Sequence, residues 1–255
     1  MGLLDAQRGA AVDVTSSAAT IIVVGLGPGP GDLVTAETRA AIARAAVRFV
    51  RTADHPAAGE LLPDAVDVGV LLETAAHGRP AHGPIVEALV AAATDHGEIL
   101  YAVPGSPLVL ERSVRALLAD GRVRCKVLPA LSFLDLAWAR LGVDPVADGV
   151  RLVDASEMTT SGGPAASGPL LVAHVHDRQT FGGVRTVLAG SDDDAVVVLT
   201  LLGHADEAVV ATTWRALAAD DAFPADASTC LYVPAGATPA DTGYRRFHRL
   251  VRTLR

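Results

Sequence analysis

Cysteine and basic residues are scarce in this chain, and each shortage excludes a class of protein. The 255 residues include two cysteines, Cys125 and Cys230, which are too few for a disulfide framework and lack the spacing of a metal site. Two reduced, buried thiols are expected instead, as in a cytoplasmic protein. The formal net charge is −8, so non-specific binding to nucleic acid has no electrostatic support.

Long hydrophobic runs are also missing. The longest apolar stretches have the length of a strand, far short of the roughly 20 residues that a membrane helix needs. Residues 1–20 lack the basic start and apolar centre of a signal peptide, and we expect them to form a disordered arm. The sequence therefore predicts a soluble cytoplasmic protein that binds neither nucleic acid nor a membrane.

The most informative segment present is a glycine- and proline-rich loop. A β-branched run at 21–24 leads into residues 25–31, which contain four glycines and two prolines, and such loops lie where α/β folds bind ligands. The dinucleotide fingerprint G-x-G-x-x-G fails, because Pro30 occupies the third glycine position and Pro28 lies inside the turn. Both prolines remove N–H groups that a phosphate cradle needs. No Gly-Lys-Ser/Thr follows either, since Lys126 is the only lysine, so the loop is open but not built for phosphate.

Strand and helix patterns alternate through the first half of the chain. After the run at 21–24, strands are expected at 47–51, 98–103 and 124–128. Helices are expected at 36–48, at 85–94, from about 109 to 119, and around 133–138. Such alternation predicts right-handed βαβ units and a parallel sheet.

The pattern changes near residues 142–145. Strands are expected at 150–154, 170–174, 195–201 and 229–233, with a helix around 205–217 and a mobile loop over 156–168. We therefore predict a second α/β domain with mixed strand directions. The predicted organisation is a disordered arm (1–20), an N-terminal α/β domain (21–143), a C-terminal α/β domain (144–238) and a basic helical tail or linker (239–255).

Three loop motifs follow one another along the chain, at residues 25–35, 104–107 and 128–132, and their order is informative. Together they resemble the tetrapyrrole methylase family, the class III S-adenosylmethionine-dependent methyltransferases, over residues of about 21–235. The resemblance implies two α/β domains with a ligand cleft between them, in which the cofactor S-adenosylmethionine lies folded. It also implies a homodimer.

A closer resemblance is to the YabN-like N-terminal domain of MazG-type proteins. It rests on residues 51–56, 101–109, 132–135, 141–145, 153–155 and 231–234. In that group a C-terminal MazG domain hydrolyses nucleoside triphosphates with clustered acidic residues. This chain has no E-E-x-x-E cluster and so no pyrophosphohydrolase motif. We expect it to be the methylase-like half, and a MazG domain is a possible fused or separate partner.

The resemblance implies nine cofactor contacts, drawn from both halves of the chain. They are Pro28, Pro104, Gly105, Ser106, Val109, Ser132, Phe133, His174 and Gly203. Ser106 stands where the family has an aspartate, and His174 stands where it has a methionine. These departures leave two readings open, a methyltransferase with an unknown acceptor or a non-catalytic ligand-sensing or dimerisation module of a MazG protein.

Several polar residues allow a second interpretation. His55 ends a predicted strand, so it is either a residue of the substrate cleft or part of the turn before Pro56. His174 and His176 could form one side of a zinc site on a strand, but no third ligand stands out. The acidic run 192–194 is typical of a solvated turn, because it lacks the alternating spacing of metal ligands. No metal site is therefore predicted. No specific catalytic residue is predicted either, since methyl transfer requires no nucleophilic side chain.

Overall fold

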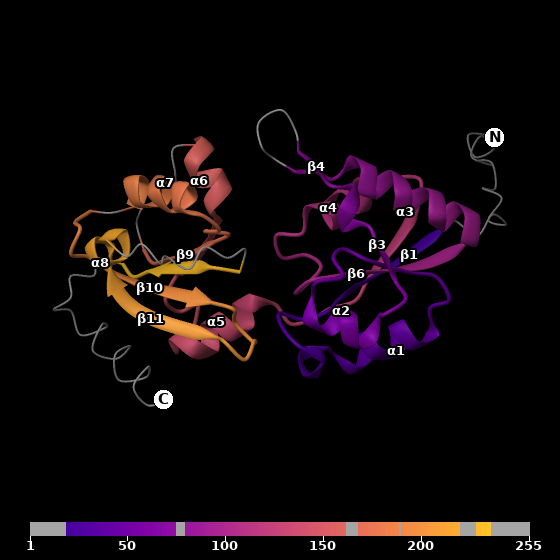
Figure 1. Cartoon of the computed structure of the whole chain (residues 1–255), viewed down its shortest axis with the longest axis horizontal. Coiled ribbons are helices and arrows are strands. Elements are labelled where there is room, and N and C mark those ends of the chain that lie inside the picture. Colours follow the sequence, from indigo (N-terminus) through magenta and orange to yellow (C-terminus); the bar gives the residue numbers. More distant parts are fainter. Residues whose placement is uncertain (1–18, 75–79, 162–167, 189, 220–227, 236–255) are drawn as a thin grey trace, which may run out of the picture.

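The chain forms two α/β lobes, each built on a five-stranded sheet (Figure 1). The computed structural model describes residues 19–74, 80–161, 168–188, 190–219 and 228–235. The expected arm, residues 1–20, lies outside these ranges except for its last two residues, and Thr20 already belongs to the first strand. The expected basic tail, residues 239–255, also lies outside them.

The first sheet is parallel throughout, as the sequence predicts. Its strands are β1 (Thr20–Gly25), β2 (Arg48–Val50), β3 (Val66–Asp67), β6 (Glu98–Val103) and β7 (Arg124–Val127). They follow the order β3-β2-β6-β1-β7. The central strands β1 and β6 are nearly continuous apolar runs with both faces buried, which is typical of a parallel sheet covered on both sides.

Two layers of helices cover the first sheet (Figure 1). The helices are α1 (Ala36–Arg44), α2 (Pro56–Leu61), α3 (Gly83–His96) and α4 (Arg112–Ala119). One face packs against α3 and α4 around Ile21, Tyr101 and Leu89. The other packs against α1 and α2 around Val24 and Leu100. Short elements between them are η1 (Gly31–Leu33), η2 (Gly69–Leu71) and the hairpin of β4 (Glu73–Thr74) and β5 (Pro80–Ala81).

The second sheet is mixed, again as expected. Its strands are β8 (Arg151–Asp154), β9 (Leu170–Ala173), β10 (Ala195–Thr200), β11 (Ala208–Thr213) and β12 (Cys230–Val233). They follow the order β11-β10-β12-β9-β8, with β8 and β9 parallel and the remaining pairs antiparallel. The two sheets together confirm the predicted fold class of two α/β units.

Helices also cover both faces of the second sheet. They are α5 (Phe133–Leu141), α6 (Ala155–Ser161), α7 (Arg178–Leu188) and α8 (Trp214–Ala219). Helix α5 packs on one face with Leu171 and Val197, although it precedes the expected domain boundary at residue 143. The other three pack on the opposite face around Trp214, whose ring stacks on Phe181 at a centroid distance of 6.1 Å. None of the helices within the described ranges is long and apolar enough to cross a membrane.

Two expectations for the second half are wrong. The helix expected around 205–217 is instead β11 followed by the short α8, because the Val-Val-Ala-Thr-Thr run pairs antiparallel with β10. The loop expected over 156–168 begins as α6, and residues 162–167 lie outside the described ranges. The Asp154 carboxylate accepts a hydrogen bond from the Ser156 backbone at 2.8 Å, and Met158 is buried in the core. A cap and an apolar contact therefore outweigh the loop-like composition.

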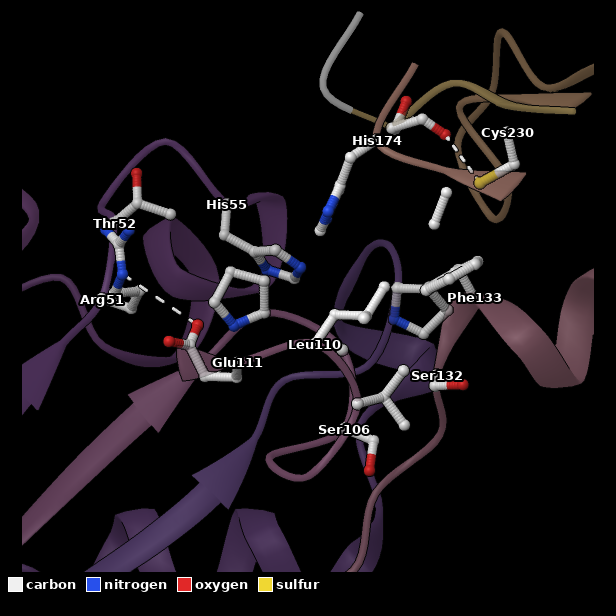
Figure 2. Close-up of a pocket in the computed structure, with 16 residues that line it drawn as sticks. Arg51, Thr52, His55, Ser106, Leu110, Glu111, Ser132, Phe133, His174 and Cys230 are labelled. Atoms are coloured by element: carbon white, nitrogen blue, oxygen red, sulfur yellow. Dashed lines mark hydrogen bonds and ion pairs between the residues drawn. The ribbon is translucent and has the colours of Figure 1, made fainter. Parts of the chain in front are cut away.

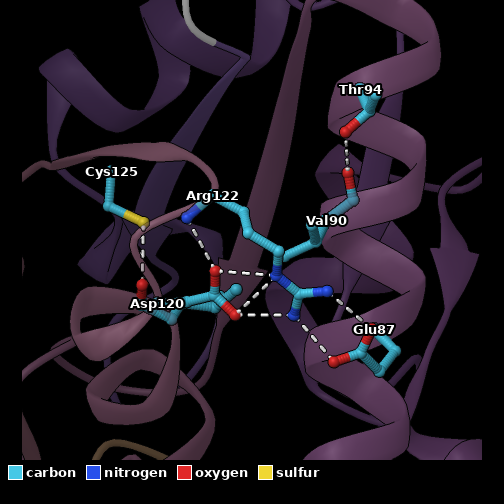
Figure 3. Close-up of polar contacts among 7 residues, drawn as sticks. Glu87, Val90, Thr94, Asp120, Arg122 and Cys125 are labelled. Atoms are coloured by element: carbon cyan, nitrogen blue, oxygen red, sulfur yellow. Dashed lines mark hydrogen bonds and ion pairs between the residues drawn. The ribbon is translucent and has the colours of Figure 1, made fainter.

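An ion-pair cluster on the surface of the first lobe joins α3 to the turn after α4 (Figure 3). The Arg122 guanidinium donates to Glu87 of α3 at 2.7 and 2.9 Å and to Asp120 after α4 at 2.7 Å. The hydrogen bonds from Arg122 lower the pKa of Asp120 to about 2. Because the arginine and Glu87 are exposed, we expect the cluster to orient the turn before β7 more than it stabilises the fold.

Candidate functional site

The three loop motifs meet at the carboxyl ends of the parallel strands. Gly25 ends β1, and a Cβ atom there would lie 2.2 Å from the Gly105 carbonyl oxygen, 2.5 Å from Cβ of Ala130 and 2.8 Å from Cδ of Pro107. Gly27 and Gly105 also exchange backbone hydrogen bonds, at 2.8 and 3.2 Å. Glycine at position 25 therefore lets the segments around Gly105 and Ala130, which are distant in the sequence, approach the backbone of β1 closely.

A pocket of about 390 Å³ opens beside this junction, with walls from both lobes. The first lobe and the segment leading into α5 contribute Pro28, Arg51, Thr52, His55, Pro104, Gly105, Ser106, Val109, Leu110, Glu111, Ser132 and Phe133. The second lobe contributes Ala173, His174, Ser228 and Cys230. Figure 2 shows Arg51, His55 and Glu111 gathered on one side and Phe133 and Cys230 on the other.

Eight of the nine expected cofactor positions line this pocket. The ninth, Gly203, lies beside it, where a Cβ atom would be 2.9 Å from the side chains of Leu33 and Leu136 and 3.6 Å from the Pro28 carbonyl oxygen. The structure thus brings the nine positions together, while their contact with a cofactor stays a prediction. Sequence reasoning did not single out Arg51 or Glu111 as site residues, although Arg51 begins the quoted segment 51–56 and Glu111 directly precedes α4.

Strained backbone marks the pocket wall. Leu110 and His174 have φ angles of 59° and 60°, a region that residues with a Cβ atom rarely adopt, and both line the pocket. Strand β9 ends at Ala173, so His174 is not on a strand, and His176 instead bonds through Nδ1 to the His174 carbonyl oxygen at 2.9 Å. The structure therefore does not support the alternative of a zinc pair on one strand. No group of three or more His, Cys, Asp or Glu in the described part of the chain could hold a metal ion.

The His174 ring is fixed by a carboxylate. Its Nδ1 lies 3.2 Å from Oδ2 of Asp154, and the same carboxylate lies 3.7 Å from the Arg112 guanidinium of α4. Burial raises the pKa of Asp154, but hydrogen bonds from His174 and Ser156 outweigh burial and hold that pKa below its usual range. Asp154 is therefore a stable anion that connects the pocket histidine to the first lobe.

Ser132 lies at the point where the third motif becomes a helix. Its side chain accepts from the Leu134 backbone at 3.0 Å, and its own N–H donates to Asp135 at 2.7 Å. These two bonds form a capping box, which satisfies free donors at the start of α5. The cap fixes the direction in which Phe133 leaves the loop toward the pocket.

His55 lies in the pocket wall, which favours the cleft interpretation over simple turn chemistry. Its Nε2 is 3.1 Å from the Gly27 carbonyl oxygen, and because a carbonyl can only accept, Nε2 carries the proton. Nδ1 is enclosed and has no hydrogen-bond partner in the described ranges. Burial lowers the pKa of His55, and the bond to Gly27 only partly opposes this effect, so the neutral ring joins the β2–α2 turn to the first motif.

Stability is expected to fall as the pH is lowered from about 7 toward about 5. Because the folded pKa of His55 lies below 6.5, the unfolded chain takes up a proton below that pH that the folded protein does not. Replacing His55 by glutamine removes this group and should reduce the loss, measured as the change in urea midpoint between the two pH values. Burial lowers the pKa of His82 as well, so part of the loss should remain. An equal loss in variant and wild type would contradict the prediction.

A parallel sheet and a mixed sheet, with a pocket between them at the glycine- and proline-rich loops, are the fold of the tetrapyrrole methylase structures. The chain matches the family described as Tetrapyrrole (Corrin/Porphyrin) Methylases over residues 20–218. It belongs to this family, whose members are S-adenosylmethionine-dependent methyltransferases. The resemblance inferred from the three motifs is therefore confirmed.

Known relatives agree with this assignment. The chain is 30% identical over 200 residues to the uncharacterized protein YabN of Bacillus subtilis (strain 168), covering 75% of this chain and 40% of that protein. It thus spans less than half of that relative's length. A uroporphyrin-III-C-methyltransferase from Thermus thermophilus superposes with a TM-score of 0.67 at 16% identity, covering 92% of this chain and 97% of the other. A uroporphyrin-III C-methyltransferase from the same organism in complex with S-adenosylhomocysteine gives a TM-score of 0.62 at 18% identity, covering 84% and 92%.

Proposed function

We propose that the pocket binds S-adenosylmethionine and its product S-adenosylhomocysteine, and that the protein transfers a methyl group to an acceptor that is still to be identified. The observation that carries this proposal is the meeting of the three family motifs around one pocket, which eight of the nine matched positions line. A volume of about 390 Å³ is within the usual range for a small-molecule site.

The pocket walls suit an adenosyl sulfonium compound. Gly105 has a φ of 61°, and a Cβ atom there would meet nothing within 4 Å, so its backbone borders open space. Pro28, Val109 and Phe133 provide apolar surface. Methyl transfer breaks the bond from carbon to the sulfonium sulfur as the acceptor's lone pair forms the new one. Catalysis is then mainly in-line positioning and exclusion of water, which these walls would provide.

Binding of S-adenosylhomocysteine is the direct test. A saturable heat is expected in isothermal titration, and ligand at about 100 times its Kd should raise the free energy of unfolding by about 2.7 kcal/mol. Adenosine monophosphate is the matched control. It should bind weakly, because the prolines of the first motif leave no backbone N–H cradle for its phosphate. No heat and no thermal shift with millimolar S-adenosylhomocysteine would refute the proposal.

A second candidate is a ligand-sensing or dimerisation module that binds the cofactor without turnover. It is favoured by His174, because an imidazole held by Asp154 replaces the methionine of the family at the pocket wall. A MazG domain, fused or separate, and a second copy of the chain are its proposed partners, on the resemblance of the sequence motifs to the MazG-type group. Cofactor binding with no methyl turnover on any tetrapyrrole would favour the module, and a stable monomer would count against dimerisation. A cytoplasmic location is part of both proposals.

A further inference from the structure

Arg51 has a guanidinium group in the pocket wall with very little to bind. It follows β2 directly, and its N–H donates to the Ala102 carbonyl oxygen at 2.8 Å, so its backbone is fixed in the sheet. Its side chain is only 18% exposed. Within the described residues its one charged partner is Glu111, whose Oε2 lies 4.0 Å from Nε. Nε itself is buried without a hydrogen bond, although a buried guanidinium normally has its donors satisfied.

Glu111 does not satisfy the Arg51 donor, because one of its carboxylate oxygens is held by Ser113 and the other lies 4.0 Å from Nε. Its Oε1 accepts from the Ser113 backbone at 3.0 Å and from the Ser113 hydroxyl at 2.6 Å, which caps α4. The Ser113 hydroxyl is also 2.8 Å from the buried Tyr101 hydroxyl. A structural ion pair would bring its nitrogen and oxygen within hydrogen-bond distance, and 4.0 Å is beyond it. The carboxylate therefore offsets the charge of Arg51 without using its N–H groups.

We propose that Arg51 binds a carboxylate group of the ligand in this pocket, an inference that rests on the proposed function. The planar guanidinium presents paired N–H groups that match a carboxylate. The nearby Glu111 charge disfavours a doubly charged phosphate more strongly than a singly charged carboxylate. This carboxylate is either that of the amino-acid end of S-adenosylmethionine or one on the methyl acceptor.

The first arm of the test compares S-adenosylhomocysteine with methylthioadenosine, which lacks the amino-acid end. Both are titrated into wild-type protein, Arg51→Gln, Arg51→Lys and the control Arg124→Gln, which removes an exposed arginine on β7. If Arg51 binds the cofactor carboxylate, Arg51→Gln should weaken S-adenosylhomocysteine at least about tenfold and leave methylthioadenosine unchanged. Arg51→Lys keeps the positive charge, so its affinity for S-adenosylhomocysteine should fall less than that of Arg51→Gln. The lysine variant also serves as the test variant should the glutamine variant fail to fold.

The second arm uses uroporphyrin III, a tetrapyrrole polycarboxylate, added to protein saturated with S-adenosylhomocysteine and followed by its fluorescence. If Arg51 binds an acceptor carboxylate, Arg51→Gln should weaken uroporphyrin at least about tenfold and leave S-adenosylhomocysteine unchanged. Unchanged S-adenosylhomocysteine affinity together with unchanged or absent uroporphyrin binding overturns the inference. Wild-type protein that binds neither adenosyl compound instead defeats the proposed function, and uroporphyrin titrated alone then still decides the role of Arg51.

Discussion

Replacing Gly25 by alanine is expected to destabilise the protein by about 3 kcal/mol or more, because overpacking a junction that cannot move is among the costliest substitutions. The new methyl group would lie 2.2 Å from the Gly105 carbonyl oxygen and 2.5 Å from Cβ of Ala130. Neither neighbour is the end of a flexible side chain, so at least one of the three loops must shift. Cofactor binding should be lost with the junction. Urea unfolding of both proteins measures the difference.

Gly59→Ala is the matched control for this substitution. Gly59 lies within α2 and is exposed, and a Cβ atom there would meet nothing within 4 Å. Alanine at a helical position without a clash should raise stability by about 0.5–1 kcal/mol. The same chemical change is thus expected to act in opposite directions at the two positions. A Gly25→Ala protein as stable as the wild type would show that the three loops do not form the rigid junction described above.

Substituting Gly105 by asparagine should weaken S-adenosylhomocysteine by about 10- to 100-fold with a much smaller effect on folding. Asparagine tolerates positive φ better than most residues, and Gly105 has a φ of 61°. Gly105 lines the pocket and no neighbour lies within 4 Å of its Cβ position, so we expect the side chain to take up pocket space that the cofactor is proposed to fill. Isothermal titration measures the affinity, and the urea midpoint checks the fold.

Gly97→Asn separates the pocket effect from the backbone effect. Gly97 caps α3 with a φ of 78°, and a Cβ atom there would also meet nothing within 4 Å. It does not line the pocket. Its substitution should therefore cost a similar amount of stability and leave the affinity for S-adenosylhomocysteine unchanged. Equal affinity in the two variants would place the adenosyl group away from Gly105.

Local sequence patterns were sufficient to predict most of the strands and helices of the first lobe. The expected strand at 98–103 coincides with β6, and α4 and β7 lie close to their expected positions. Buried parallel strands are continuous apolar runs bounded by glycine and proline, so each can be recognised without its neighbours. In the second lobe β11 was mistaken for a helix, because its burial depends on pairing with β10. An edge strand of mixed exposure carries no clear period of its own.

In the candidate site, too, some residues could be found from local sequence patterns and others only from the tertiary structure. The loop motifs are local, so Gly25, Pro28, Gly105 and Ser132 could be selected from the sequence with the family resemblance. Arg51 and Glu111 could not be paired in this way, because they are 60 positions apart and meet only where β2 and α4 reach the same end of the sheet. The fixed tautomer of His55 likewise depends on the Gly27 carbonyl of another loop.

The sequence by itself determined the family, the two α/β units and the three loops that meet at the pocket, because glycine, proline and apolar periodicity act on the nearest stretch of backbone. Only the tertiary structure decided that α5 packs on the second sheet, that Asp154 holds His174, and that Nε of Arg51 is buried in the pocket wall without a hydrogen bond. The physical reason is that burial and electrostatic pairing depend on which distant segments come together, and no local pattern records those neighbours.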